Sequence, residues 1–267
     1  MNISGRQSLL LFVTALTIVL VVIVLWASYP RLSAPELDSQ VGASTLTFSS
    51  TQEWDEDWLM FLNQTRSPNH ITEIAKRSIV INQPPQNNSD TTTKELEFLH
   101  DLIKERTPEK LQEIESEKDL ENVRFGSLVL FDETMKASYP HTVTVLNYAN
   151  DNVIAVVLHF KQIFDRVRPS YLDKTLTTTI SVPRHPAYPS GHSSQAYTFA
   201  HILGELDNNN KDTYLEAAYR VAHNREIAGV HYPSDSEAGR SLAMQYVQIL
   251  FNDPEFLKLF AAAKTEW

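Results

Sequence analysis

The chain of 267 residues contains no cysteine. Disulfide bonds, thiolate catalysis, iron–sulfur clusters and cysteine-ligated zinc are therefore excluded. Basic residues are outnumbered, with 23 lysines and arginines against 33 aspartates and glutamates and a formal net charge of −10. This balance argues against nonspecific binding of nucleic acids as the main activity. An anionic substrate would have to be attracted by a local cluster of cations rather than by the field of the whole protein.

Long hydrophobic runs are also absent, except for one at residues 9–27. As a helix it would span about 28 Å, close to the hydrocarbon thickness of a bilayer. Because Arg6 precedes it, the positive-inside tendency places the rest of the chain on the periplasmic or extracellular side. We expect residues 1–28 to be a membrane anchor, with a cleaved signal peptide and an exported soluble form as the alternative. Residues 29–50 are typical of a linker, and 51–267 of one domain.

The remaining composition is that of a globular protein, with 42% hydrophobic and 21% charged residues. The longest apolar segment of the domain, 141–168, stops at Pro169. Its β-branched residues permit a strand, but its length favours a buried helix. Further helices are expected after His192 and over 212–230, the latter ended by Pro233. With no convincing hairpin signal, the sequence predicts an all-α domain.

Two charged segments, 94–107 and 107–123, also read as helices, and the second contains a proline near its expected start. Charged helices of this kind usually present a solvated face to water. Nothing in residues 51–140 indicates which of them cover an active site.

Lys161 and Arg168 lie at the end of the apolar segment, seven residues apart. Seven residues are about two helical turns, so both side chains are expected on one helix face. A lone pair of this kind is usually solvated. At the end of a buried helix, however, two unpaired cations would be costly, and the position favours a bound anion.

The sequence Pro189-Ser190-Gly191-His192 stands at the beginning of the next helix. Free N–H groups at a helix N-terminus, together with the helix dipole, make an anion site. Gly191 removes the Cβ that would block close approach, and the Ser190 hydroxyl can add a hydrogen bond. The stretch therefore resembles half of a phosphate cradle with an acid/base histidine at its edge. Taken alone, a capped helix with an incidental histidine also explains it.

A third group combines Arg225 with His231 six residues later and Asp235 four residues after that. The break at Pro233 turns the chain so that the carboxylate can come back to the imidazole. An aspartate that accepts from one ring nitrogen fixes the tautomer and makes the other nitrogen more nucleophilic. A single histidine near a helix end is more often structural, so this group indicates a catalytic site only in combination with the other two groups.

Taken together, Lys-x6-Arg-Pro, Pro-Ser-Gly-His and Arg-x5-His-x3-Asp follow one another within residues 161–235. This order and spacing resemble the type 2 phosphatidic acid phosphatase superfamily, which includes bacterial class A acid phosphatases and vanadium-dependent haloperoxidases. The segment GVHYPSDSEAGR is similar to the acid phosphatase branch. Two positions depart from the pattern: Asn224 replaces the usual serine, and Ala187-Tyr188 stand where acid phosphatases often carry Gly-Ser-Tyr. The resemblance implies an α-helical bundle of the acid phosphatase/vanadium haloperoxidase type.

The resemblance also implies a metal-independent phosphatase that hydrolyses phosphomonoesters through a phosphohistidine intermediate, with no cofactor. His231 would attack phosphorus while Asp235 holds its ring. His192 would protonate the leaving oxygen and then activate water. The residues implied as phosphate-binding are Lys161, Arg168, Ser190, Gly191 and Arg225. They would replace a metal, and the sequence has no cluster with obvious metal-ligand spacing.

Two other enzymes use the same kind of site. A vanadium-dependent haloperoxidase would hold vanadate as its cofactor, with His231 coordinating vanadium, and a lipid phosphatase would act on lipid phosphates. A non-catalytic anion-binding module is disfavoured because both histidines, the aspartate and all three cations are present. Expected partners are a small phosphorylated substrate or a lipid phosphate, and the membrane through residues 9–27, but no nucleic acid. Of the other histidines, His185 could line the rim, whereas His201 and His223 are expected to be ordinary helix residues.

Overall fold

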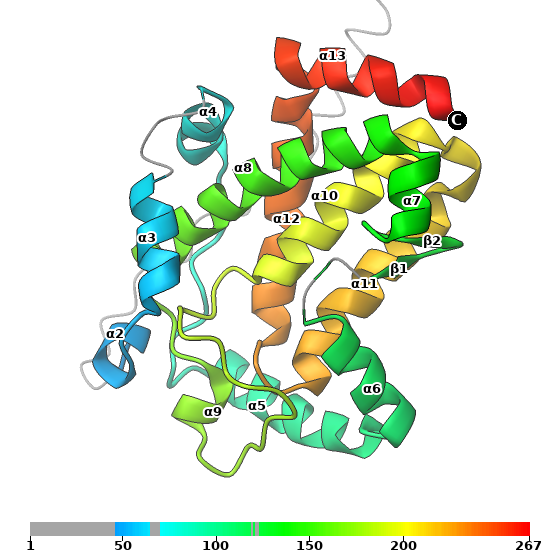
Figure 1. Cartoon of the computed structure of the whole chain (residues 1–267). Helices are drawn as coiled ribbons and strands as arrows, with labels where there is room; N and C mark the ends of the chain where they lie inside the picture. Colours follow the sequence, from blue (N-terminus) through cyan, green and yellow to red (C-terminus); the bar gives the residue numbers. More distant parts are fainter. Residues whose placement is uncertain (1–45, 65–69, 119, 121–122) are drawn as a thin grey trace, which may run out of the picture. The chain divides into compact units, whose positions relative to one another are not determined.

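In a computed structural model, residues 46–64, 70–118, 120 and 123–267 are described, and all of them belong to one compact unit (Figure 1). These residues are mostly helical, which confirms the predicted helical class. One short hairpin, β1 (Arg124–Phe125) paired antiparallel with β2 (Leu128–Val129), is an addition that the sequence did not indicate.

The predicted membrane segment, residues 9–27, lies outside the described residues. Among the described residues, none of the helices combines the length and the apolar composition that a membrane crossing needs. The anchor therefore stays a prediction. The last residues of the predicted linker pack on the domain: Phe48 is fully buried, and its N–H donates to the carbonyl oxygen of Asp165 at 2.8 Å.

Five helices carry the core. α10 (Gly191–Leu206) packs against α8 (Pro140–Phe164), α11 (Lys211–Ile227) and α12 (Pro233–Leu250), and α13 (Pro254–Ala263) packs against α8 (Figure 1). Three of these helices begin with proline, whose missing N–H is not needed in a first turn. The fully buried apolar side chains at the centre include Val153, Val156, Phe199, Ala200, Leu203, Leu242 and Tyr246.

The other helical elements lie around this core. The α-helices are α2 (Phe48–Thr51), α3 (Glu56–Gln64), α4 (His70–Ser78), α5 (Asp90–Leu102), α6 (Pro108–Ser116), α7 (Glu133–Ser138) and α9 (Pro169–Leu172). The short 3₁₀ turns are η1 (Ile103–Glu105), η3 (Asn208–Asn210) and η4 (Lys264–Glu266).

The end of α8 differs from the prediction. The helix stops at Phe164 because Asp165 takes a left-handed conformation with φ 44°. Arg168 follows in an extended conformation, as expected for a residue before proline. Lys161 and Arg168 therefore do not share a helix face; the chain leaves the helix between them.

Two glycines bring the remaining site segments together. Gly229, with φ 77°, turns the chain between α11 and α12 towards His231. Gly239 lets the first turns of α12 lie against the start of α10, because a Cβ there would stand 2.7 Å from the Ser190 carbonyl oxygen. The N-termini of α10 and α12 thus meet beside the end of α8.

Candidate active site

One cavity of about 430 Å³ collects residues from all three motifs. Lys161, Gly191, His192, Arg225 and His231 line it. The other predicted site residues stand next to this set without lining the cavity: Arg168, Ser190 and Asp235. The structure therefore brings all eight predicted residues together in one place.

His231 is held from both sides in a single tautomer. Its Nδ1 lies 3.0 Å from Oδ2 of Asp235, and its Nε2 lies 3.1 Å from Nη1 of Arg168. Because a guanidinium can only donate, Nε2 must be the acceptor and Nδ1 must carry the proton. Burial and the charges of Arg168 and Lys161 hold the pKa of His231 well below its usual value. Its Nε2 lone pair is therefore unprotonated, which is the state that a nucleophile requires.

His192 is the second residue of α10, and its ring contacts backbone carbonyls instead of a carboxylate. Its Nε2 lies 3.1 Å from the carbonyl oxygens of Glu117 and Lys118, which follow α6. Carbonyls accept, so Nε2 carries a proton here. Burial, followed by the charge of Arg225, lowers the pKa of His192 to about 3. The imidazole is thus neutral at pH 7 in the protein without a ligand.

The three predicted cations are buried, and each of them donates to a backbone carbonyl. Lys161 Nζ donates to the oxygens of Pro186 and Ala187, and burial lowers its pKa well below the usual value. Arg168 donates to the oxygens of His185 and Val230, and burial lowers its pKa to about 10. Both side chains are thereby fixed beside the cavity through contacts that include no carboxylate.

Arg225 carries the clearest sign of a missing partner. It is 1% exposed, and Nη2 donates to the Ile114 carbonyl oxygen at 2.8 Å. Its Nε and Nη1 are buried and have no hydrogen-bond partner among the described residues. Unpaired donors on a buried cation are costly unless a ligand supplies the acceptor. Because Arg225 lines the cavity, the expected ligand is an anion bound there.

Ser190 and Gly191 are used differently from each other. The Ser190 hydroxyl accepts from the Ser193 N–H at 3.4 Å as the N-cap of α10, and its side chain does not line the cavity. At Gly191 an added Cβ would meet its nearest atoms, in Gln195 and Val157, at 3.9 Å, an ordinary contact distance. Neither packing nor backbone conformation therefore requires glycine there. Close approach of a ligand to the backbone would explain it.

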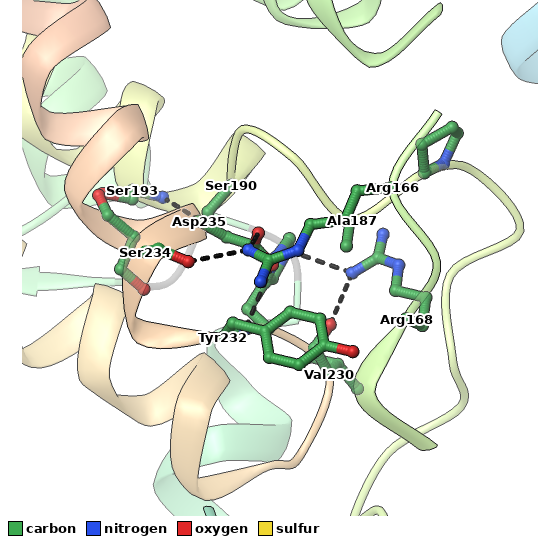
Figure 2. A network of polar contacts seen from close by, with 12 residues as sticks. Arg166, Arg168, Ala187, Ser190, Ser193, Val230, Tyr232, Ser234 and Asp235 are labelled. Carbon is green, nitrogen blue, oxygen red and sulfur yellow. Dashed lines mark hydrogen bonds and ion pairs between the residues drawn. The ribbon is translucent and has the colours of Figure 1, made fainter. Parts of the chain in front are cut away.

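Sequence reasoning missed a buried ion network around Asp235. Figure 2 shows the Arg166 guanidinium over the ring of Tyr232, with Nη1 donating to Asp235 Oδ1 at 2.6 Å and to Ser234 Oγ at 2.7 Å. Its Nη2 donates to Oε2 of Glu95, on α5, at 3.0 Å. Arg166 lies inside the first motif segment. Its presence there as a third cation, beside Lys161 and Arg168, is the signal that could have identified it. Glu95 lies in a charged segment that predicted only a solvated face.

A second buried carboxylate, Glu117, was missed for the same reason. Its Oε2 accepts from Asn224 Nδ2 at 2.8 Å and lies 3.5 Å from Nη2 of Arg225. Burial raises its pKa. Asn224, the departure from the family pattern, thus positions Glu117 beside Arg225 and does not line the cavity.

The additional histidines also have defined places. His185 lines the cavity, and its Nδ1 lies 3.0 Å from Nη2 of Arg168. His223 pairs with Glu226 at 2.9 Å, and His201 lies partly buried on α10. Among the described residues, no group of three or more histidines and carboxylates is arranged to hold a metal ion.

Comparisons with known proteins agree with this geometry. The model of the PAP2 superfamily matches residues 142–257. A non-specific acid phosphatase of Providencia stuartii is 32% identical over 111 residues, which are 40% of this chain and 45% of that protein. A non-specific acid phosphatase of Salmonella typhimurium is 25% identical over 212 residues, 76% of this chain and 85% of that protein. The resemblance inferred from the motifs, including its acid phosphatase branch, is confirmed.

The fold has a solved counterpart. The crystal structure of a bacterial vanadium-dependent iodoperoxidase superposes with a TM-score of 0.54 and 15% sequence identity, covering 80% of this chain and 62% of that chain. This likeness shows the shared helical fold. The region of this chain that matches the Providencia stuartii protein covers less than half of that protein's length.

Proposed function

We propose, from the match of residues 142–257 to the PAP2 superfamily model, that the protein is a metal-independent phosphatase that hydrolyses phosphomonoesters through a phosphohistidine. One observation carries the proposal. His231, with Nδ1 bonded to Asp235 and Nε2 unprotonated, lines the same cavity as Arg225, two of whose buried donors have no partner among the described residues. A phosphoryl group is an anion that needs both a nucleophile and such donors.

In the first step, Nε2 of His231 attacks phosphorus, and the ester P–O bond breaks as the N–P bond forms. Asp235 stabilises the positive charge that develops on the imidazole. The phosphoryl oxygens accept from Arg225, and the neighbouring charges of Lys161 and Arg168 balance their negative charge. In the protein without substrate, Nε2 accepts from Arg168, so it exchanges this contact for phosphorus during the attack.

His192 handles the protons of both steps. The negative charge of a bound phosphoryl group favours its protonated form and opposes the effect of Arg225 on its pKa. It then donates to the leaving oxygen. In the second step it takes a proton from water, the water oxygen attacks phosphorus, and the N–P bond breaks to release phosphate. His231 returns to its starting state.

We further propose that residues 9–27 anchor the enzyme in a membrane, with the catalytic domain on the periplasmic or extracellular side. Either small soluble phosphates or lipid phosphates would then be within reach of the domain. The hydrophobic run and Arg6 before it support this part of the proposal.

The test is release of p-nitrophenol from p-nitrophenyl phosphate by the full chain in excess EDTA, from acidic to neutral pH. We expect turnover that resists EDTA and is lost in His231→Ala. His223→Ala serves as the matched control, since this histidine pairs with Glu226 outside the cavity. Normal turnover in His231→Ala would overturn the assignment. Trapping of ³²P from a labelled substrate, stable in alkali and labile in acid, would identify the phosphohistidine.

The vanadium-dependent alternative shares these residues. The cations and His231 also suit vanadate, which when bound would supply peroxide activation for halide oxidation. Absence of phosphatase turnover, combined with halide oxidation after addition of vanadate and peroxide, would favour that activity instead.

A further inference from the structure

Much of the cavity wall is built from apolar side chains. α8 presents Ile154, Val157 and Leu158 to it, one and two turns before Lys161. Spacings of three, four and seven residues place all four side chains on one face of the helix. The helix that supplies a phosphate-binding cation therefore also supplies a continuous apolar wall next to it.

Apolar side chains from two other segments also line the cavity. Ile180, Val182 and Pro183, from the loop between α9 and α10, line it. Trp58 of α3 also lines it, and its ring stands edge-on to that of His185, with the ring centres 5.5 Å apart. His185 in turn contacts Arg168, so the indole lies close to the phosphate-binding end.

Polar residues outside the phosphate-binding set also line the cavity, and one of them, Gln195, donates through Nε2 to Asn150 Oδ1 at 2.8 Å. Lys118, Ser181 and Arg184 are exposed. Asp55 accepts from the Asp57 N–H at the start of α3. These groups face water or bond within the chain. Sugar hydroxyls placed along the inner wall would therefore lose hydrogen bonds to water without replacement.

The size of the cavity limits the leaving group. Its volume of about 430 Å³ falls towards the lower end of the roughly 300–1,000 Å³ typical of small-molecule sites. Part of it is taken by the phosphoryl group. A single ring or a short alkyl chain fits in the remainder, whereas two long acyl chains would have to remain outside the mouth.

We infer that the enzyme selects phosphomonoesters whose leaving alcohol is compact and apolar, above all aromatic, and that Trp58 is a residue that determines this specificity. The inference rests on the proposed phosphatase function. Trp58 lies outside residues 142–257, so the selecting wall combines a superfamily helix with a segment from elsewhere in the chain.

The test compares kcat/KM for benzyl phosphate and glycerol 3-phosphate, both esters of primary alcohols, by release of inorganic phosphate from the full chain. We expect benzyl phosphate to be preferred by roughly ten-fold or more. In Trp58→Ala and in Ile154→Thr, kcat/KM should fall about ten-fold for benzyl phosphate and less than about two-fold for glycerol 3-phosphate. Trp54→Ala, which also removes an indole near His185 but not from the cavity wall, is the matched control.

The outcomes separate the two proposals. No phosphate release from any ester would refute the phosphatase itself, and the inference with it. Release without preference, or an equal loss for both esters in Trp58→Ala, would overturn only the inference. Faster turnover of dioctanoyl phosphatidic acid than of benzyl phosphate would contradict the limit to compact leaving groups.

Discussion

Replacing Arg166 by methionine should destabilise the fold by about 3–5 kcal/mol, because two buried carboxylates lose their cation. Arg166 is 4% exposed, and it holds Asp235 at 2.6 Å and Glu95 at 3.0 Å. Methionine keeps an unbranched apolar stem while removing the charged guanidinium, which lies over the Tyr232 ring. The expected loss therefore reports the contacts of the charged group and not those of the stem. Phosphatase kcat should fall with little change in KM, since Arg166 contacts Asp235 and does not line the cavity.

The effect of Glu95→Gln should depend on the background. With Arg166 in place, glutamine should cost about 1–3 kcal/mol because a charge-assisted hydrogen bond becomes a neutral one. In Arg166→Met, the same change removes one of two unpaired charges and should restore stability. Opposite signs in the two backgrounds give a coupling energy above about 1 kcal/mol.

Urea unfolding of the full chain, followed by far-UV circular dichroism, measures these differences. Arg240→Met on α12 is the matched control, because its ion pair with Glu237 is exposed and should contribute about 0–1 kcal/mol. If the free energy of unfolding of Arg166→Met lay within about 1 kcal/mol of the wild type, as expected for the control, the reasoning would be refuted. Additive effects of the two substitutions would refute it as well.

Gly191→Ala should leave stability within about 1 kcal/mol of the wild type, since a Cβ meets only ordinary contacts there. In this variant, roughly ten-fold more inorganic phosphate should be needed to give the same thermal shift. An unchanged phosphate response would show that the ligand does not approach this backbone. The protein should also lose stability as pH falls, because burial lowers the pKa of His192 to about 3 while the unfolded chain titrates near pH 6.5. Between these two pKa values the unfolded state binds more protons than the folded state. The urea midpoint should therefore fall between pH 7 and pH 5, and it should fall less in His192→Gln. An equal fall of the midpoint in the two proteins would contradict this.

Local signals in the sequence predicted the elements that begin or end at fixed breaks. α10 starts at Gly191 after its serine cap, as N-caps indicate, and α11 ends before Pro233, as expected for a helix before a proline. The end of α8 was wrong by several residues because the left-handed conformation of Asp165 has no strong signature. That turn is held by tertiary contacts, among them a hydrogen bond from the Ser49 hydroxyl to the Asp165 carboxylate.

The site was predictable where its chemistry is concentrated in short motifs. His231 and Asp235 are four residues apart, so a local turn suffices to join them. Glu95 and Glu117 could not be found in this way. Each lies on or beside a charged helix, and only packing against segments more than 70 residues away buries it. Periodicity describes a helix face but not the surface that covers it.

The Glu95–Arg166 contact has a consequence for how the sequence can change over time. A substitution that removes only one of the two leaves a buried charge unmatched, so each residue is expected to change only together with the other. In a set of homologues this would appear as covariation between α5 and the segment after α8, with the two residues of the pair kept or replaced together. The strongest correlated positions near this site would then join a residue inside the first motif segment to a helix that no motif covers.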